Sequence, residues 1–163
     1  MFVEGMVLMK KFGIVVWVIL CAWITQAQAQ SPAIQGQWYI RAVLTTTSVP
    51  NAHVKEGHRK DEVWQIQQRG NTATLTTPNG AINGHFVPQT PEFPGGVWYF
   101  QAMVPNFMNQ RNLGAKFEVV IVKRSANVLS GGTTVTYMGN NSFGGPWVPL
   151  GLESWRFEAA RTR

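Results

Sequence analysis

The chain has a single cysteine, Cys21, and lacks an apolar run long enough to cross a membrane. Cys21 lies in the apolar stretch 12–24, which is shorter than the roughly 20 residues that a membrane-spanning helix requires. A lone cysteine excludes an internal disulfide and a multi-cysteine metal site. Any domain in this chain must therefore be stable through its hydrophobic core, without a covalent cross-link.

Residues 1–29 have the pattern of a cleaved signal peptide. Lys10 and Lys11 precede the apolar stretch, and the small residues Ala27 and Ala29 mark a cleavage site before Gln30. The alternative is an uncleaved membrane anchor, which the short apolar stretch disfavours. We expect residues 30–163 to be exported, to a periplasm or to the exterior, as one domain long enough to bury a core.

Carboxylates are scarce, with eight Asp and Glu against 14 Lys and Arg. A positive net charge suits an anionic lipid, a polysaccharide or an acidic partner, and it also suits solubility alone. The basic residues are scattered and do not form the clustered stripe of a nucleic-acid binder. The composition therefore excludes nucleic acid as a partner and leaves peripheral contact with a membrane open.

Motifs of catalysis are absent as well. The chain has no Gly-x-Ser-x-Gly nucleophile motif and no Gly-rich phosphate loop that opens a helix. His53 and His58 lie near carboxylates, but Lys60 and other basic residues crowd the same segment, which is typical of a solvated charged loop running up to Glu62. The sequence thus predicts no catalytic residue, no metal site and no cofactor. It leaves open a lyase or isomerase that acts through a single Glu, His or Tyr.

What the chain has instead is period-two alternation of apolar and polar residues, interrupted by Gly, Pro and Asn clusters. This pattern is typical of β-strands and hairpins. It predicts eight strands, over residues 37–48, 62–69, 72–77, 81–87, 97–104, 115–124, 128–138 and 153–161. Eight short sequential strands favour an all-β fold, an eight-stranded antiparallel up-and-down β-barrel.

Two segments resemble a known family. Gly36-Gln37-Trp38 resembles the Gly-x-Trp motif that opens lipocalins, and the tail from Trp155 to Arg161 resembles the last strand of lipocalin-like and avidin-like (calycin-type) barrels. The resemblance implies a minimal barrel in which an arginine of the last strand lies across the N-terminal tryptophan. Arg161 is in phase with Trp155 and Phe157, so we expect Trp38 and Arg161 to form a structural closure at one end.

The order of strands also predicts where a binding site lies. In an up-and-down barrel, loops 49–61, 105–114 and 139–152 lie at the end opposite Trp38. Trp147, between Pro146 and Pro149, is the expected anchor because it is large and conformationally restrained. Apolar loop residues and interior aromatics complete the predicted ligand-binding set: Trp147, Phe143, Phe107, Met108, Trp98 and Tyr137.

These features predict a non-enzymatic binding protein that holds a small apolar molecule, or an envelope component, at the open end of the barrel. The alternative is a filled barrel, an interaction module whose rim loops dock on a protein, a glycan or a membrane surface. Aromatic residues at interior positions suit a pocket and a filled core equally well, so the sequence leaves both open.

The cleavage site gives a first prediction. N-terminal sequencing of the exported protein should begin at Gln30, because Ala27 and Ala29 fit the small-residue requirement of signal peptidase. Recovery of residues 1–24 in the membrane fraction would contradict both export and the domain boundary.

Overall fold

The structure is a computed structural model that describes residues 31–49, 54–89, 91–140 and 145–162. The predicted signal peptide, His53 and Phe143 lie outside the described residues. In the described part, no helix is both long and apolar enough to span a membrane.

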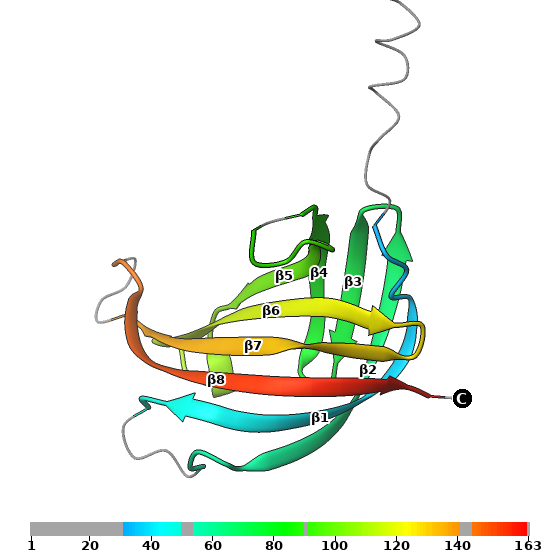
Figure 1. Cartoon of the computed structure of the whole chain (residues 1–163). Coiled ribbons are helices and arrows are strands. Elements are labelled where there is room, and N and C mark those ends of the chain that lie inside the picture. Colours follow the sequence, from blue (N-terminus) through cyan, green and yellow to red (C-terminus); the bar gives the residue numbers. More distant parts are fainter. Residues whose placement is uncertain (1–30, 50–53, 90, 141–144, 163) are drawn as a thin grey trace, which may run out of the picture. The chain divides into compact units, whose positions relative to one another are not determined.

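Eight antiparallel strands follow one another around a closed barrel (Figure 1). Each strand pairs with the next in the chain, and the last returns to pair with the first. This arrangement confirms the predicted all-β up-and-down barrel. The elements are β1 (Gly36–Thr47), β2 (Arg59–Arg69), β3 (Thr72–Thr77), β4 (Gly80–Val87), β5 (Val97–Val104), the 3₁₀ turn η1 (Phe107–Asn109), β6 (Leu113–Ser125), β7 (Val128–Gly139) and β8 (Val148–Arg161).

Two strands begin well before the predicted residue, whereas the others begin within about two residues of it. β2 begins at Arg59 and β8 begins at Val148, before the predicted residues 62 and 153. Arg59 pairs with Val43 of β1, and Val148 pairs with Gly139 of β7. In these segments charged residues or proline interrupt the alternation of apolar and polar residues. Their strand conformation therefore depends on pairing with the neighbouring strands. The loops predicted at 49–61 and 139–152 are correspondingly shorter.

Alternation along the strands decides which side chains lie inside. Nine aromatic residues occupy interior phases, and in the structure seven of them are buried while Phe117 and Tyr137 are half-buried. The buried seven are Trp38, Trp64, Phe86, Trp98, Phe100, Trp155 and Phe157.

One end of the barrel is filled by the segment 31–35, which precedes β1. Ile34 is completely buried, and its carbonyl accepts a hydrogen bond from Trp38 Nε1 at 2.8 Å. The Pro32 carbonyl accepts one from Trp98 Nε1 at 3.1 Å. The segment therefore satisfies two buried indole N–H groups at once, which an apolar core alone cannot do. The segment has no periodic pattern, so this role could not be predicted from the sequence.

Arg161 lies across Trp38 at the same end. Its guanidinium carbon is 5.0 Å from the centre of the indole, and Nη2 donates a hydrogen bond to the Gln35 carbonyl at 2.7 Å. The two residues are also register partners in the β1–β8 pairing. The last strand is thus fixed to the first by a ring contact, a charged hydrogen bond and the backbone.

Glycines let aromatic rings fill this closed half of the lumen. A Cβ added at Gly131 would collide with the Val120 carbonyl and lie 2.7 Å from the Phe157 ring, and one added at Gly84 would collide with the Phe100 ring. Rings from neighbouring strands therefore occupy the space that side chains at these two positions would need.

The contact between Arg161 and Trp38 predicts an effect on stability. Arg161→Ala should lower the free energy of unfolding by about 1–2 kcal/mol, because a cation–π contact and a charged hydrogen bond are lost at a partly solvated site. Urea denaturation measures this. Arg156→Ala, an exposed position on the same strand, is the control and should change stability by less than about 0.5 kcal/mol. Equal effects of the two variants would contradict a specific closure.

Candidate functional site

The other half of the barrel encloses a cavity of about 170 Å³. Small side chains at Ala42, Ala102 and Thr133 leave this space, in contrast to the ring-filled closed half. The barrel is therefore filled at one end and hollow at the other. The lining residues are Ala42, Lys60, Glu62, Trp64, Thr77, Asn79, Gly80, Ala81, Ile82, Ala102, Val104, Phe107, Phe117, Val119, Thr133, Val135, Tyr137, Glu153, Trp155 and Phe157.

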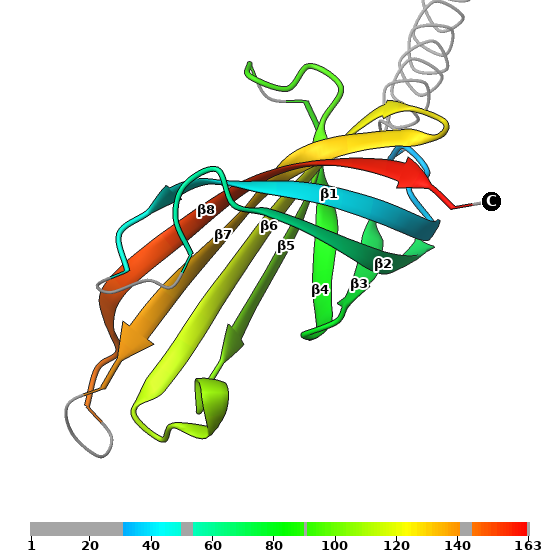
Figure 2. The same cartoon turned by 90° about the horizontal axis from the view of Figure 1, so that it is seen from below.

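The cavity borders a split in the barrel wall. β4 and β5 pair only from Gly84 to Val87 on one side and from Val97 to Phe100 on the other. Beyond these pairs β5 diverges from β4, as Figure 2 shows. Residues on both edges of the split, 81–82 on β4 and 102 and 104 on β5, line the cavity. The cavity therefore extends to the junction of β4 and β5, near the short β3–β4 hairpin.

Phe107 forms part of the cavity wall. Its ring centre lies 5.9 Å from those of Phe117 and Tyr137. The flanking residues Asn106 and Met108 both have positive φ angles, 54° and 56°. Left-handed backbone is unusual outside glycine and asparagine, and here it flanks Phe107, which is half-buried and lines the cavity. Phe107 and Tyr137 are thus the two predicted ligand-binding residues that the structure brings together in the cavity.

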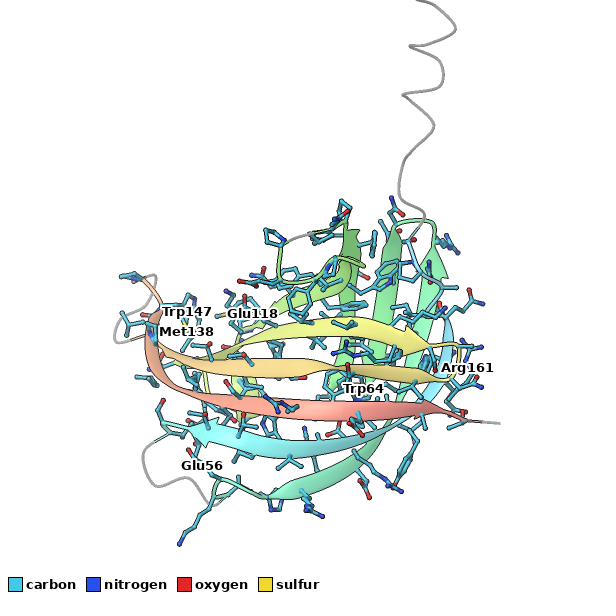
Figure 3. The ribbon with its side chains drawn as sticks, in the orientation of Figure 1. Glu56, Trp64, Glu118, Met138, Trp147 and Arg161 are labelled. Carbon is cyan, nitrogen blue, oxygen red and sulfur yellow. The ribbon has the colours of Figure 1, made fainter. Side chains whose placement is uncertain are left out.

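The remaining predicted ligand-binding residues lie elsewhere. Trp98 is fully buried at the closed end, and Met108 is 72% exposed on the rim. The Trp147 ring lies over Gly114, within 3.1 Å of where a Cβ would stand there, on the outward face of β6. Figure 3 shows Trp147 and Arg161 at opposite ends of the barrel. Trp147 therefore lies on the predicted rim but does not line the cavity, and Phe143 is outside the described residues.

Charged residues that the sequence analysis did not place in the site line the cavity instead. Lys60 was expected in a solvated loop, which is wrong, because β2 already includes it and its phase is that of Trp64. Glu62, where this charged loop meets the predicted strand 62–69, has the same phase. Glu153 on β8 has the phase of Trp155 in the same way. The missed signal is a repeated Glu-x-Trp, Glu62-Val63-Trp64 and Glu153-Ser154-Trp155, at interior phases of two strands.

The two Glu-x-Trp segments are built alike. Glu62 Oε2 accepts a hydrogen bond from Trp64 Nε1 at 2.8 Å, and Glu153 Oε2 accepts one from Trp155 Nε1 at 3.3 Å. In a strand, residues two apart project from the same face, which lets each carboxylate reach the next indole. Each hydrogen bond fixes the orientation of one indole and one carboxylate against the cavity.

Lys60 connects the two segments. Its Nζ lies 2.9 Å from Glu62 Oε1 and 4.5 Å from the centre of the Trp155 ring. The side chain crosses β1 at Ala42, which pairs with Lys60 on one side and with Phe157 on the other. A larger residue than alanine at position 42 would occupy this path. The ammonium is thus held between a carboxylate and a π face.

Tyr137, on β7, lies near Glu153 of the neighbouring strand β8. Burial and the nearby Glu153 carboxylate together raise the pKa of Tyr137 to about 12. The phenol therefore stays neutral at physiological pH and keeps its O–H as a hydrogen-bond donor. Glu153 itself is only 8% exposed. The site combines aromatic walls with two carboxylates, one ammonium and one phenol, for a formal charge of −1.

The phenol gives a prediction. In a spectrophotometric titration, Tyr137 should ionise near pH 12 in the wild type, and Glu153→Gln should lower its pKa while leaving it above 10, because burial remains. The stabilising effect of the neutral phenol is present below pH 10 and is lost as the pH rises through 12. The control is Glu118→Gln, since Glu118 accepts a hydrogen bond from Tyr99 and raises the pKa of Tyr99 to about 12. A shift of Tyr137 in the control variant, or none in Glu153→Gln, would contradict the arrangement.

Comparison with known proteins adds no assignment to this site. No protein-family model, no curated protein and no solved structure matches the chain. The functional conclusion therefore depends on the geometry of the cavity.

Proposed function

We propose that this protein is an exported, non-enzymatic binding protein that holds a small, largely apolar molecule in the open half of its barrel. The observation that carries the proposal is the cavity between Trp64, Trp155, Phe117 and Phe107. Concave sites with aromatic walls and a few placed polar groups are typical of ligand-binding pockets. The two glutamates and Tyr137 supply those polar groups.

The size of the cavity limits the ligand. An apolar cavity of about 150 Å³ holds one benzene molecule, whereas pockets for drug-sized ligands have about 300–1,000 Å³. A cavity of about 170 Å³ fits one aromatic ring or a short chain of similar volume. A fatty acid or a tetrapyrrole is too large unless the walls move apart.

Two observations support a relationship in plan to lipocalins, as a minimal member of the calycin-type barrels. The strand order is that of an up-and-down barrel, and the first-strand tryptophan lies beneath a last-strand arginine. The signal-peptide pattern of residues 1–29 supports export to a periplasm or to the exterior.

A second candidate function is docking through the rim. Apolar side chains are exposed there, among them Met108 at 72%, Leu150 at 52% and Val148 at 42%. The two rim loops are joined by a hydrogen bond from Asn140 N to the Asn112 carbonyl at 3.0 Å. Exposed apolar patches often mark contacts with proteins or membranes. In this function the rim, with Trp147, binds an envelope component, and the cavity has no ligand.

Tryptophan side chains distinguish the two functions. After residue 30 the chain has five tryptophans: Trp64 and Trp155 at the cavity, Trp38 and Trp98 at the closed end, and Trp147 on the rim. In ¹H–¹⁵N spectra, toluene and benzyl alcohol should shift the indole signals of Trp64 and Trp155 and leave those of Trp38 and Trp98 unchanged. Lipid vesicles that shift Trp147 alone would support docking instead.

A substitution that fills the cavity tests the same proposal. Ala102→Phe should weaken binding of toluene and benzyl alcohol at least about tenfold, about 1.4 kcal/mol, because the added ring occupies the cavity. Gln101→Phe is the matched control, since the adjacent residue is exposed on the outer face, and its affinity should equal that of the wild type. If the larger ring of Ala102→Phe destabilises the fold, Ala102→Leu is measured in its place. Wild-type binding by a folded Ala102→Phe protein would rule out the cavity as the site.

A further inference from the structure

The polar groups of the cavity indicate the chemical class of its ligand. We propose that the ligand is a small organic ammonium, with one aromatic or aliphatic group, whose cationic head lies between the Glu153 carboxylate and the face of Trp155. This inference rests on the proposed function, because it names the chemistry of the same cavity.

The environment of Glu153 is the first argument for a cationic ligand. It is 8% exposed, and its partners are neutral, an indole N–H at 3.3 Å and the nearby Tyr137 phenol. Among the described residues, no Lys, Arg or His nitrogen lies within 4.0 Å of its carboxylate, since the ion pairs found there are Lys60–Glu62 and Lys116–Glu118. A buried carboxylate without a counter-ion is costly. A cationic ligand removes that cost, whereas a neutral one leaves it in place.

The position of Lys60 is the second argument, because its ammonium already lies against the Trp155 face of the cavity. Its Nζ lies 4.5 Å above Trp155 and 2.9 Å from Glu62, which is the arrangement that binds a cation by a ring face and a carboxylate. The Lys60 side chain is 35% exposed and has a flexible four-carbon stem. It can turn outwards to solvent and leave the Trp155 face to a second ammonium.

The formal charge of the cavity is the third argument for a cationic ligand. Two carboxylates and one ammonium face the cavity, so an anionic ligand meets net repulsion and a cationic ligand meets net attraction. The aromatic walls contact the apolar part of the ligand, and the cavity extends to the junction where β4 and β5 diverge. A compact ligand with one ring and one ammonium matches both the volume and the charge.

Three probes of similar size test the charge preference: benzylamine, benzyl alcohol and benzoate. Their dissociation constants are measured at pH 7 from the indole shifts of Trp64 and Trp155. Benzylamine should bind at least about tenfold more tightly than benzyl alcohol, and benzoate should bind more weakly than both. Equal binding of benzylamine and benzyl alcohol would overturn the inference and leave the proposed function standing. Binding of none of the three to a folded protein would overturn both.

Glu153→Gln keeps an acceptor for Trp155 and removes the charge. It should reduce the affinity for benzylamine at least about tenfold and leave that for benzyl alcohol unchanged. Glu158→Gln is the matched control, because Glu158 lies exposed on the outer face of the same strand, and it should bind both probes as the wild type does. If Glu153→Gln fails to fold, Glu62→Gln serves in its place and should reduce the preference for benzylamine. A preference that survives both charge removals would overturn the inference.

Lys60→Met tests the competition for Trp155. Methionine keeps an apolar stem without the charge, so benzylamine should bind about threefold or more tightly once the tethered ammonium is removed, with no change for benzyl alcohol. A loss of benzylamine affinity in this variant would show that Lys60 helps to hold the ligand, and would overturn its role as a competitor.

Discussion

The pairing of the first strand with the last is the interaction on which the rest of the molecule depends. β1 pairs with β2 on one side and with β8 on the other. Without the second pairing, β2 and β8 would lie near opposite edges of an open sheet, and the two Glu-x-Trp segments would not face each other. Closure places them on either side of Ala42, within reach of the Lys60 side chain. The Trp38–Arg161 contact thus stabilises the geometry of a site at the far end of the barrel.

Much of the fold was predictable because alternation is a local signal. The positions of Trp38, Trp64, Trp98 and Phe157 followed from it, as did the order of the strands and the end at which the longer loops lie. The segment 31–35 was not predictable, since its role depends on two carbonyl groups that meet indoles from β1 and β5. Backbone acceptors in a non-periodic segment leave no mark on the sequence.

The residues that line the cavity are harder to predict from the sequence than the fold, and for a related reason. Apolar loop residues such as Trp147 are the expected binding surface, whereas Lys60 and the nearby Glu62 are expected to be solvated because charged residues usually lie outside. Extending the alternation of β2 back from Trp64 would have placed both inside. Glu153 was equally visible in phase with Trp155. Glu153 becomes informative when it is compared with Glu62, which lies two strands away around the closed barrel. The β1–β8 pairing is what brings the two Glu-x-Trp segments near each other.

The split between β4 and β5 has a consequence for motion. Closing a sheet into a barrel removes its edges, but here residues 81–83 and 101–104 keep backbone groups without a ladder partner across the junction. Amide protection should fall from the β6–β8 wall towards this junction, since local opening follows the weakest hydrogen bonding. Small molecules would then enter and leave through brief separation of two strands, without unfolding of the rest. Under the proposed function, residence time in the cavity depends on the β4–β5 junction, whereas global stability depends on the β1–β8 pairing.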